Sequence, residues 1–131
     1  MNPSIELPKD RQKEKVIQLY IDGEPSMALC DGHRYEVNHN HALMRVLKER
    51  DIEFSMLNRH APKKEGDRDS YRLCGAGVVS RGGNKLNHNG KSGTYDIGID
   101  RDHLLECRDR LRQEGEGDLE FFVGGIPLDE C

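Results

Sequence analysis

Four side chains of the kinds that bind zinc fall within twelve residues of one another. They are Cys30, His33, His39 and His41, spaced as Cys-x2-His-x5-His-x-His. If residues 33–37 form a strand, His33 and His39 lie about 20 Å apart, at about 3.3 Å per residue, which is too far to share one metal ion. The segment therefore predicts two half-sites, Cys30 with His33 and His39 with His41, and each needs further ligands.

The geometry of the second half-site depends on the backbone. In an extended segment His39 and His41 point the same way, but two residues apart on a helix they diverge by about 200°. With carboxylates as additional ligands, the pair would suit a metal-dependent hydrolase or nuclease that uses zinc or another divalent transition metal. The alternative is that these side chains are polar residues beside a helix cap and that the protein needs no cofactor.

A second group of candidate residues lies in a segment rich in glycine and asparagine, residues 81–94, which we expect to be a mobile loop. Arg81, Lys85 and Lys91 lie here with no acidic residue between positions 81 and 93. With backbone N–H groups of the glycines, they predict a site for an anion or for a partner, the alternative being a solvated loop. The segment is not a P-loop, because the first glycine of that motif is replaced by Lys85.

The elements that must position these residues follow from periodicity and from turn and cap residues. Two strand-like runs flank Asp31-Gly32, a preferred hairpin turn. Asn38 or Asn40 can cap a helix that ends near residue 50, and Asp100 can cap a second helix that ends before residue 115. Strands are expected at residues 16–21, 26–30, 33–37, 52–57, 71–80, 94–99 and 119–123. Gly75 and Gly77 suggest a bulge or a close backbone approach within a strand.

This order of elements predicts an α+β fold with an antiparallel or mixed sheet and two helices. It contains two β-α-β units and an N-terminal hairpin, and a ferredoxin-like core is one arrangement of such units. We expect residues 1–15 to be a flexible N-terminal arm and residues 16–131 to be a single α+β domain.

The composition indicates a small protein of a reducing compartment. Among 131 residues, 34% are hydrophobic and 34% are charged, so the core is modest. No apolar run is long enough to span a membrane, and the N-terminus lacks the apolar segment of a secretory signal. The cysteines at positions 30, 74, 107 and 131 form no zinc-type spacing, so we expect free thiols and a cytoplasmic location.

The charge is uneven along the chain. Residues 96–131 carry 11 acidic and 4 basic residues, whereas residues 1–95 carry 13 and 16. Without a strong catalytic motif, the sequence favours a non-enzymatic binding or regulatory protein, of the inhibitor or adaptor type, that acts through surface contacts with a macromolecular partner. We expect that partner to be another protein, since the acidic balance disfavours nucleic acid. The metal-dependent hydrolase or nuclease is the alternative.

Overall fold

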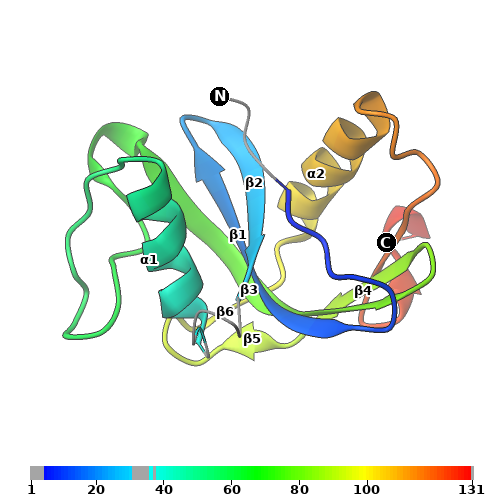
Figure 1. Cartoon of the computed structure of the whole chain (residues 1–131), viewed down its shortest axis with the longest axis horizontal. Coiled ribbons are helices and arrows are strands. Elements are labelled where there is room, and N and C mark those ends of the chain that lie inside the picture. The colour runs from blue at the N-terminus through cyan, green and yellow to red at the C-terminus, as the bar shows by residue number, and fades with distance from the viewer. Residues whose placement is uncertain (1–4, 31–35, 37, 131) are drawn as a thin grey trace.

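The computed structural model describes residues 5–30, 36 and 38–130, and it shows the expected α+β class. Two α-helices accompany a mixed six-stranded sheet and a small two-stranded sheet in these residues (Figure 1). The helices are α1 (His39–Glu49) and α2 (Arg101–Gln113), with short 3-10 turns η2 (Asp67–Asp69) and η3 (Leu128–Glu130). The strands are β1 (Lys13–Ile21), β2 (Glu24–Leu29), β3 (Tyr71–Gly82), β4 (Lys85–Asn89), β5 (Lys91–Ser92), β6 (Ile97–Gly98), β7 (Glu120–Val123) and β8 (Ile126–Pro127).

The N-terminal hairpin joins β1 to β2 through Asp22 and Gly23. Both residues have positive φ, 51° and 81°. This is the backbone that a two-residue hairpin link requires, and an aspartate followed by glycine adopts it readily. The turn thus lies at the earlier of the two Asp-Gly pairs, while the expected hairpin at Asp31-Gly32 lies outside the described residues.

The main sheet has the order β2-β1-β3-β4-β7-β8, and only β4 and β7 pair in parallel. Strands β2 and β3 are both antiparallel to β1, so they run parallel to each other, and α1 connects them. Helix α2 lies between β4 and β7 in the chain. In the strand order given above, the connection from β2 to β3 and the connection from β4 to β7 both lead towards β8. The strands of the first unit are antiparallel to those of the second, because β3 is antiparallel to β4. The right-handed crossover rule therefore predicts that the two helices lie on opposite faces of the sheet.

The packing agrees with that rule, because two separate cores lie on the two faces of β1 to β3. In one core Ile17 and Leu19 of β1 pack with Leu43 of α1. In the other core the neighbouring Val16 packs with Leu104 of α2. Figure 1 shows the helices on either side of these strands. A ferredoxin-like arrangement, with both helices on one face, is not confirmed.

A bulge in β3 changes which of its alternate side chains face the α1 core. Gln18 of β1 faces Gly75, but the next residue, Leu19, faces Leu73, so Cys74 is the extra residue. Before the bulge the odd-numbered Leu73 faces the α1 core, and after it the even-numbered Ala76 does. The prediction of a bulge or a close approach at the β3 glycines is confirmed.

Three local predictions are wrong in whole or in part. Residues 52–57 form no strand and contribute only the single bridge between Met56 and Pro62. The segment 81–94 is not one loop, because it contains β4, and Leu86 and His88 of that strand are buried at 0% and 1% exposure. Of the strand expected at 94–99, only β6 forms.

The described part of the expected arm is residues 5–15, of which 13–15 belong to β1, and the remaining residues 5–12 contact the domain at both ends. Ile5 bridges Met27 along the outer edge of β2, and the Glu6 amide donates to the Met27 carbonyl at 3.0 Å. Further along, the Arg11 amide donates to the Arg81 carbonyl at 2.9 Å. These contacts place residues 5–12 against the sheet, while the mobility of the arm stays a prediction.

Candidate functional site

The structure separates the predicted metal ligands. Cys30 follows β2, and His39 and His41 are both in the first turn of α1, where their side chains diverge. His39 is 7% exposed and its Nε2 bonds the carbonyl of Gly77 at 2.8 Å. Burial lowers the pKa of its imidazole. His33 lies outside the described residues. Within the described ranges there is no group of three or more Cys, His, Asp or Glu side chains that could hold a metal ion.

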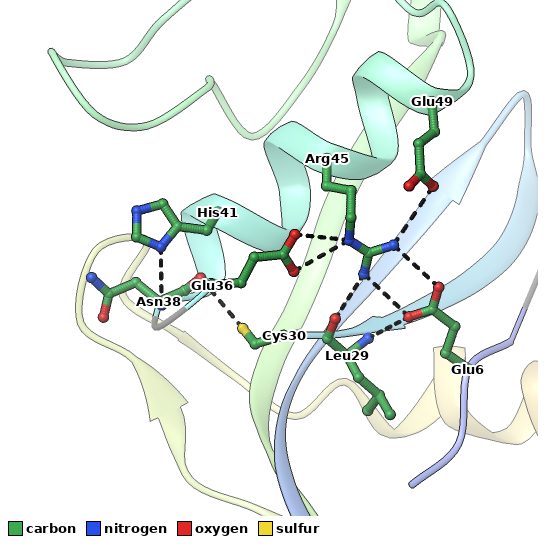
Figure 2. Close-up of polar contacts among 8 residues, drawn as sticks. All are labelled: Glu6, Leu29, Cys30, Glu36, Asn38, His41, Arg45 and Glu49. Atoms are coloured by element: carbon green, nitrogen blue, oxygen red, sulfur yellow. Dashed lines mark hydrogen bonds and ion pairs between the residues drawn. The ribbon is translucent and has the colours of Figure 1, made fainter. Parts of the chain in front are cut away.

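Cys30 and His41 both serve the start of α1 (Figure 2). The Cys30 thiol donates to the Asn38 carbonyl at 3.3 Å, and burial raises its pKa to about 11, so it stays protonated. The Asn38 amide donates to Nδ1 of His41 at 3.3 Å. Asn38, one of the two asparagines expected to cap this helix, is therefore the N-cap. Its bond to His41 satisfies a backbone N–H group that has no partner within the helix. Since Nδ1 accepts, the proton of the neutral His41 ring is on Nε2.

Arg45 of α1 is the centre of a cluster of charges shown in Figure 2. Its Nε donates to Glu36 at 2.9 Å, and one of its terminal nitrogens donates to Glu6 at 3.2 Å and to the Leu29 carbonyl at 2.8 Å. Glu49 is an ion-pair partner at 3.6 Å. The Arg45 and Glu36 side chains are only 13% and 7% exposed. The cluster ties residues 5–7 and β2 to α1, which is a structural role.

The three predicted anion-binding residues belong to three strands, and Arg81 of β3 and Lys85 of β4 lie in one hairpin. The Arg81 guanidinium donates to the carbonyls of Gly83, at 2.8 Å, and Pro8, at 3.1 Å, and so holds a turn and the N-terminal segment. Lys85 and Lys91 are both exposed, Lys85 as the first residue of β4 and Lys91 as the first residue of β5. Between these strands the chain bends at Gly90, whose φ is 81°. Their role in binding stays a prediction.

Residues 51–70, here named the anchored loop, run from the end of α1 to β3 along the outer side of that helix, at the left of Figure 1. Apart from η2 the loop has no helix or strand. Three side chains from other elements donate hydrogen bonds to backbone carbonyls of the loop. Asn40 of α1 donates to His60 at 2.7 Å, and Tyr71 of β3 donates to Lys63 at 2.7 Å. Tyr95 of the β5–β6 turn donates to Pro62 at 2.8 Å. These donors fix the path of the loop.

The tip of the anchored loop is a closed turn. The Leu57 amide donates to the Ala61 carbonyl at 2.7 Å. The Asn58 Oδ1 accepts from the amides of His60, at 2.8 Å, and Ala61, at 3.0 Å. Ala61 is completely buried. Backbone and side chain thus close the turn together, and the other side chains of the tip project outward.

Two of those side chains are large and apolar. Met56 is 40% exposed and the adjacent Leu57 is 51% exposed. Among the described residues the only other exposed large hydrophobic side chain is Ile126, in β8. The sequence pattern placed both residues in the expected strand at 52–57, of which Ile52 and Phe54 do pack on the α1 core. Ala61-Pro62 was the signal that the chain turns here.

A hollow of about 440 Å³ lies next to this tip. It is enclosed by the start of α1, the anchored loop and the β5–β6 turn, three segments that are far apart in the sequence. Among the residues that the structure describes, the lining is polar apart from one alanine and contains no carboxylate: Asn38, Asn40, His41, Asn58, Arg59, His60, Ala61 and Thr94. A basic and polar recess thus adjoins an exposed apolar pair.

A larger hollow, of about 860 Å³, lies between α2 and β7. Both acidic and basic side chains line it, and Arg108 is already bonded to Asp109 and Asp129. Because side chains of both charges line it, the hollow favours no ligand charge, and we place the candidate site at the anchored loop.

The described thiols are not activated nucleophiles. Cys107 is completely buried beside His103, with its sulfur 3.6 Å from Nδ1, and burial raises its pKa to about 12. Burial raises the pKa of Cys74 still further. His103 is itself occupied, because its Nε2 bonds the Leu19 carbonyl at 2.9 Å. A thiol acts as a nucleophile only when it ionises, so this pair serves packing.

Comparison with known proteins adds no family. No family model matches the chain, and no curated protein matches it. In the residues that the structure describes, no helix is long and apolar enough to cross a membrane.

Proposed function

We propose that this is a binding or regulatory protein, of the inhibitor or adaptor type, which contacts another protein through the anchored loop. The observation that carries the proposal is the pair Met56 and Leu57. Both are exposed and adjacent on a loop whose backbone is fixed by buried donors. Exposed apolar pairs on an ordered loop are typical of contact surfaces.

The length and order of the loop support the same function. Loops longer than about 12–15 residues without their own secondary structure are uncommon in compact domains, and those that are ordered are usually functional. A loop fixed in advance loses less conformational entropy on binding. Methionine and arginine are also enriched at protein interfaces, and Arg59 lies beside the apolar pair. The closed turn favours insertion into a recess of the partner over addition of a strand to its sheet.

No observation in the described residues favours the metal-dependent hydrolase or nuclease over this function, since His39 and His41 diverge on α1. A cytoplasmic location is part of the proposal. It is supported by the free thiols of Cys30, Cys74 and Cys107, which a reducing compartment would maintain.

The test is capture of partners from an extract of the source cells on the immobilised protein. Changing Met56→Ser and Leu57→Ser together should reduce the captured partner at least about tenfold, because apolar anchors near the centre of an interface carry most of its free energy. Ile126→Ser is the matched control, since it removes a comparably exposed side chain elsewhere. Equal capture by both variants, with unchanged thermal stability, would remove the loop from the proposed function.

A further inference from the structure

The face of the main sheet that α1 covers over β1 to β3 continues across β4 and β7. Leu86 of β4 is paired with Phe121 of β7, and both belong to the core beneath α2. The next pair, Asn87 and Phe122, therefore projects from the opposite face, because side chains alternate along a strand. In the described residues the α1 core contains no residue of β4 or β7, and Figure 1 shows β4 at the right, away from α1. We name this part of the sheet surface the open face.

The strand register places a row of side chains on the open face. Lys13 of β1 is paired with Ser80 of β3, and Ser80 is paired with Asn87 of β4. Asn87 is in turn paired with Phe122 of β7. Lys85 lies two residues before Asn87 on β4 and so projects from the same face. Both lysines are exposed, and Phe122 is half-buried. A partly exposed aromatic ring thus lies among polar and basic side chains.

These side chains suit a ligand that has both flat rings and negative charge. Phe122 is a member of neither core in the described residues, and an accessible aromatic ring can stack on a nucleic-acid base. The Asn87 Oδ1 accepts from the Gly125 amide at 2.8 Å, so its Nδ2 is the end that can donate to a base or a phosphate. Lys13 and Lys85 can contact phosphates. An acidic protein segment would use the lysines alone, whereas a nucleic acid also uses the ring.

The charge of the open face differs from that of the whole chain. The net charge of −4 disfavours nucleic acid as a partner of the molecule at large. Salt screens exposed charges beyond about 10 Å, however, so the nearest side chains decide what binds. On the open face these include Lys13 and Lys85, and the acidic Glu120 that is paired with Lys85.

We propose that the open face binds a single strand of RNA or DNA, with a base stacked on Phe122 and phosphates contacted by Lys13 and Lys85. This activity goes beyond protein binding by the anchored loop, which lies on the outer side of α1. With both surfaces, the chain is an adaptor that joins a protein to a nucleic acid.

The test is the fluorescence anisotropy of labelled single-stranded RNA and DNA of about 12 nucleotides, titrated with the wild-type protein. Phe122→Leu should weaken binding about fivefold or more, because leucine stays apolar but offers no ring to stack on. Lys13→Ala with Lys85→Ala should also weaken binding. It should lower the slope of log affinity against log salt by about 1.4, at about 0.7 for each phosphate contact.

Two further variants check the role of charge. Glu120→Gln should strengthen binding, because it removes a negative charge beside Lys85. Lys48→Ala is the control for the lysine variants, because Lys48 is exposed on α1 and not on the open face, and it should bind as the wild type does. Thermal unfolding of each variant shows whether it is folded.

Three results would overturn the inference. They are no saturable binding at about 50 mM salt, equal affinity of the wild type and folded Phe122→Leu, and displacement of the oligonucleotide by an equal concentration of a glutamate-rich peptide of the same charge. The last result would assign the open face to an acidic protein segment. The variant with Met56→Ser and Leu57→Ser should bind the oligonucleotide normally, so the inference and the proposed function can fail separately.

Discussion

Gln18 shows how a single side chain links the two halves of the fold. It is completely buried in β1, where its Oε1 accepts from the Asp100 amide at 2.8 Å and its Nε2 donates to the Asp100 carbonyl at 2.9 Å. Its Nε2 also lies 3.2 Å from Nδ1 of His103. Because Asp100 is the N-cap of α2, this one amide fixes the start of the helix on the sheet.

Gly75 leaves the space that this amide needs, which gives a prediction at the residue scale. A Cβ at position 75 would lie 2.2 Å from Oε1 of Gln18 and 2.9 Å from the Asp100 nitrogen. Gly75→Ala should therefore lower the free energy of unfolding by about 1–3 kcal/mol, measured by urea denaturation. Gly93→Ala, where no atom lies within 4 Å, should change it by less than about 0.5 kcal/mol. Equal effects would mean that Gln18 moves aside at no cost.

At the scale of the element, α1 is held by polar contacts at its first turn and at Arg45, and by its apolar face. Asn38 and His41 satisfy its first turn, and Arg45 joins it to β2 and to Glu6. The anchored loop begins where α1 ends and lies across its start through Asn40. Any displacement of the helix would therefore move the proposed binding surface.

The Arg45 cluster gives a prediction at this scale. Arg45→Met should destabilise the protein by about 3 kcal/mol, because it leaves the Glu36 carboxylate buried without its guanidinium partner. Adding Glu36→Gln should recover part of that loss, because it removes the buried charge that has lost its guanidinium partner. Both changes in the free energy of unfolding can be measured by urea denaturation.

Glu49→Gln is the control for this cycle. Its carboxylate is 49% exposed and lies 3.6 Å from Arg45, so its removal should cost less than about 0.5 kcal/mol. If Arg45→Met costs no more than Glu49→Gln, the cluster is a surface ion pair in energetic terms and α1 is held by its apolar face alone.

At the scale of the whole molecule, three buried histidines lie in different parts of the fold. His39 bonds Gly77 beneath α1, His88 bonds Phe122 between β4 and β7, and His103 bonds Leu19 beneath α2. Burial lowers the pKa of all three imidazoles below the ordinary value of 6.5. Each is neutral in the folded protein at pH 7.

These histidines predict acid sensitivity. The unfolded chain binds their protons more readily, so stability is complete above pH 6.5 and is lost as the pH falls below that value. For His88, whose pKa is lowered to about 4, the loss reaches about 3 kcal/mol at pH 4. Unfolding by urea from pH 7 to pH 4 should show a weaker pH dependence in His88→Gln than in the wild type. An identical dependence in both would show that His88 ionises within the folded protein.

Much of the local structure was predictable from the sequence, because it depends on neighbouring residues. The caps Asn38 and Asp100 and the extents of both helices follow from short-range hydrogen bonds and the 3.6-residue period. The glycines of β3 likewise indicated the bulge. The α+β class followed from the order of these elements, whereas the strands that each helix connects, β2 with β3 and β4 with β7, were decided by the fold.

Strand pairing and the candidate surface were decided by tertiary structure. Residues 52–57 alternate like a strand but pair through only one bridge, because the outer edge of β2 faces residues 5–7 and β1 is paired on both sides. The polar residues 85–89 form a strand because β3 and β7 lie beside them. The sequence by itself determined which residues can begin or end a helix and which can bend a strand, since those preferences are local. Only the fold brought Asn40, Tyr71 and Tyr95 beneath the anchored loop, since these donors come from positions far apart in the chain.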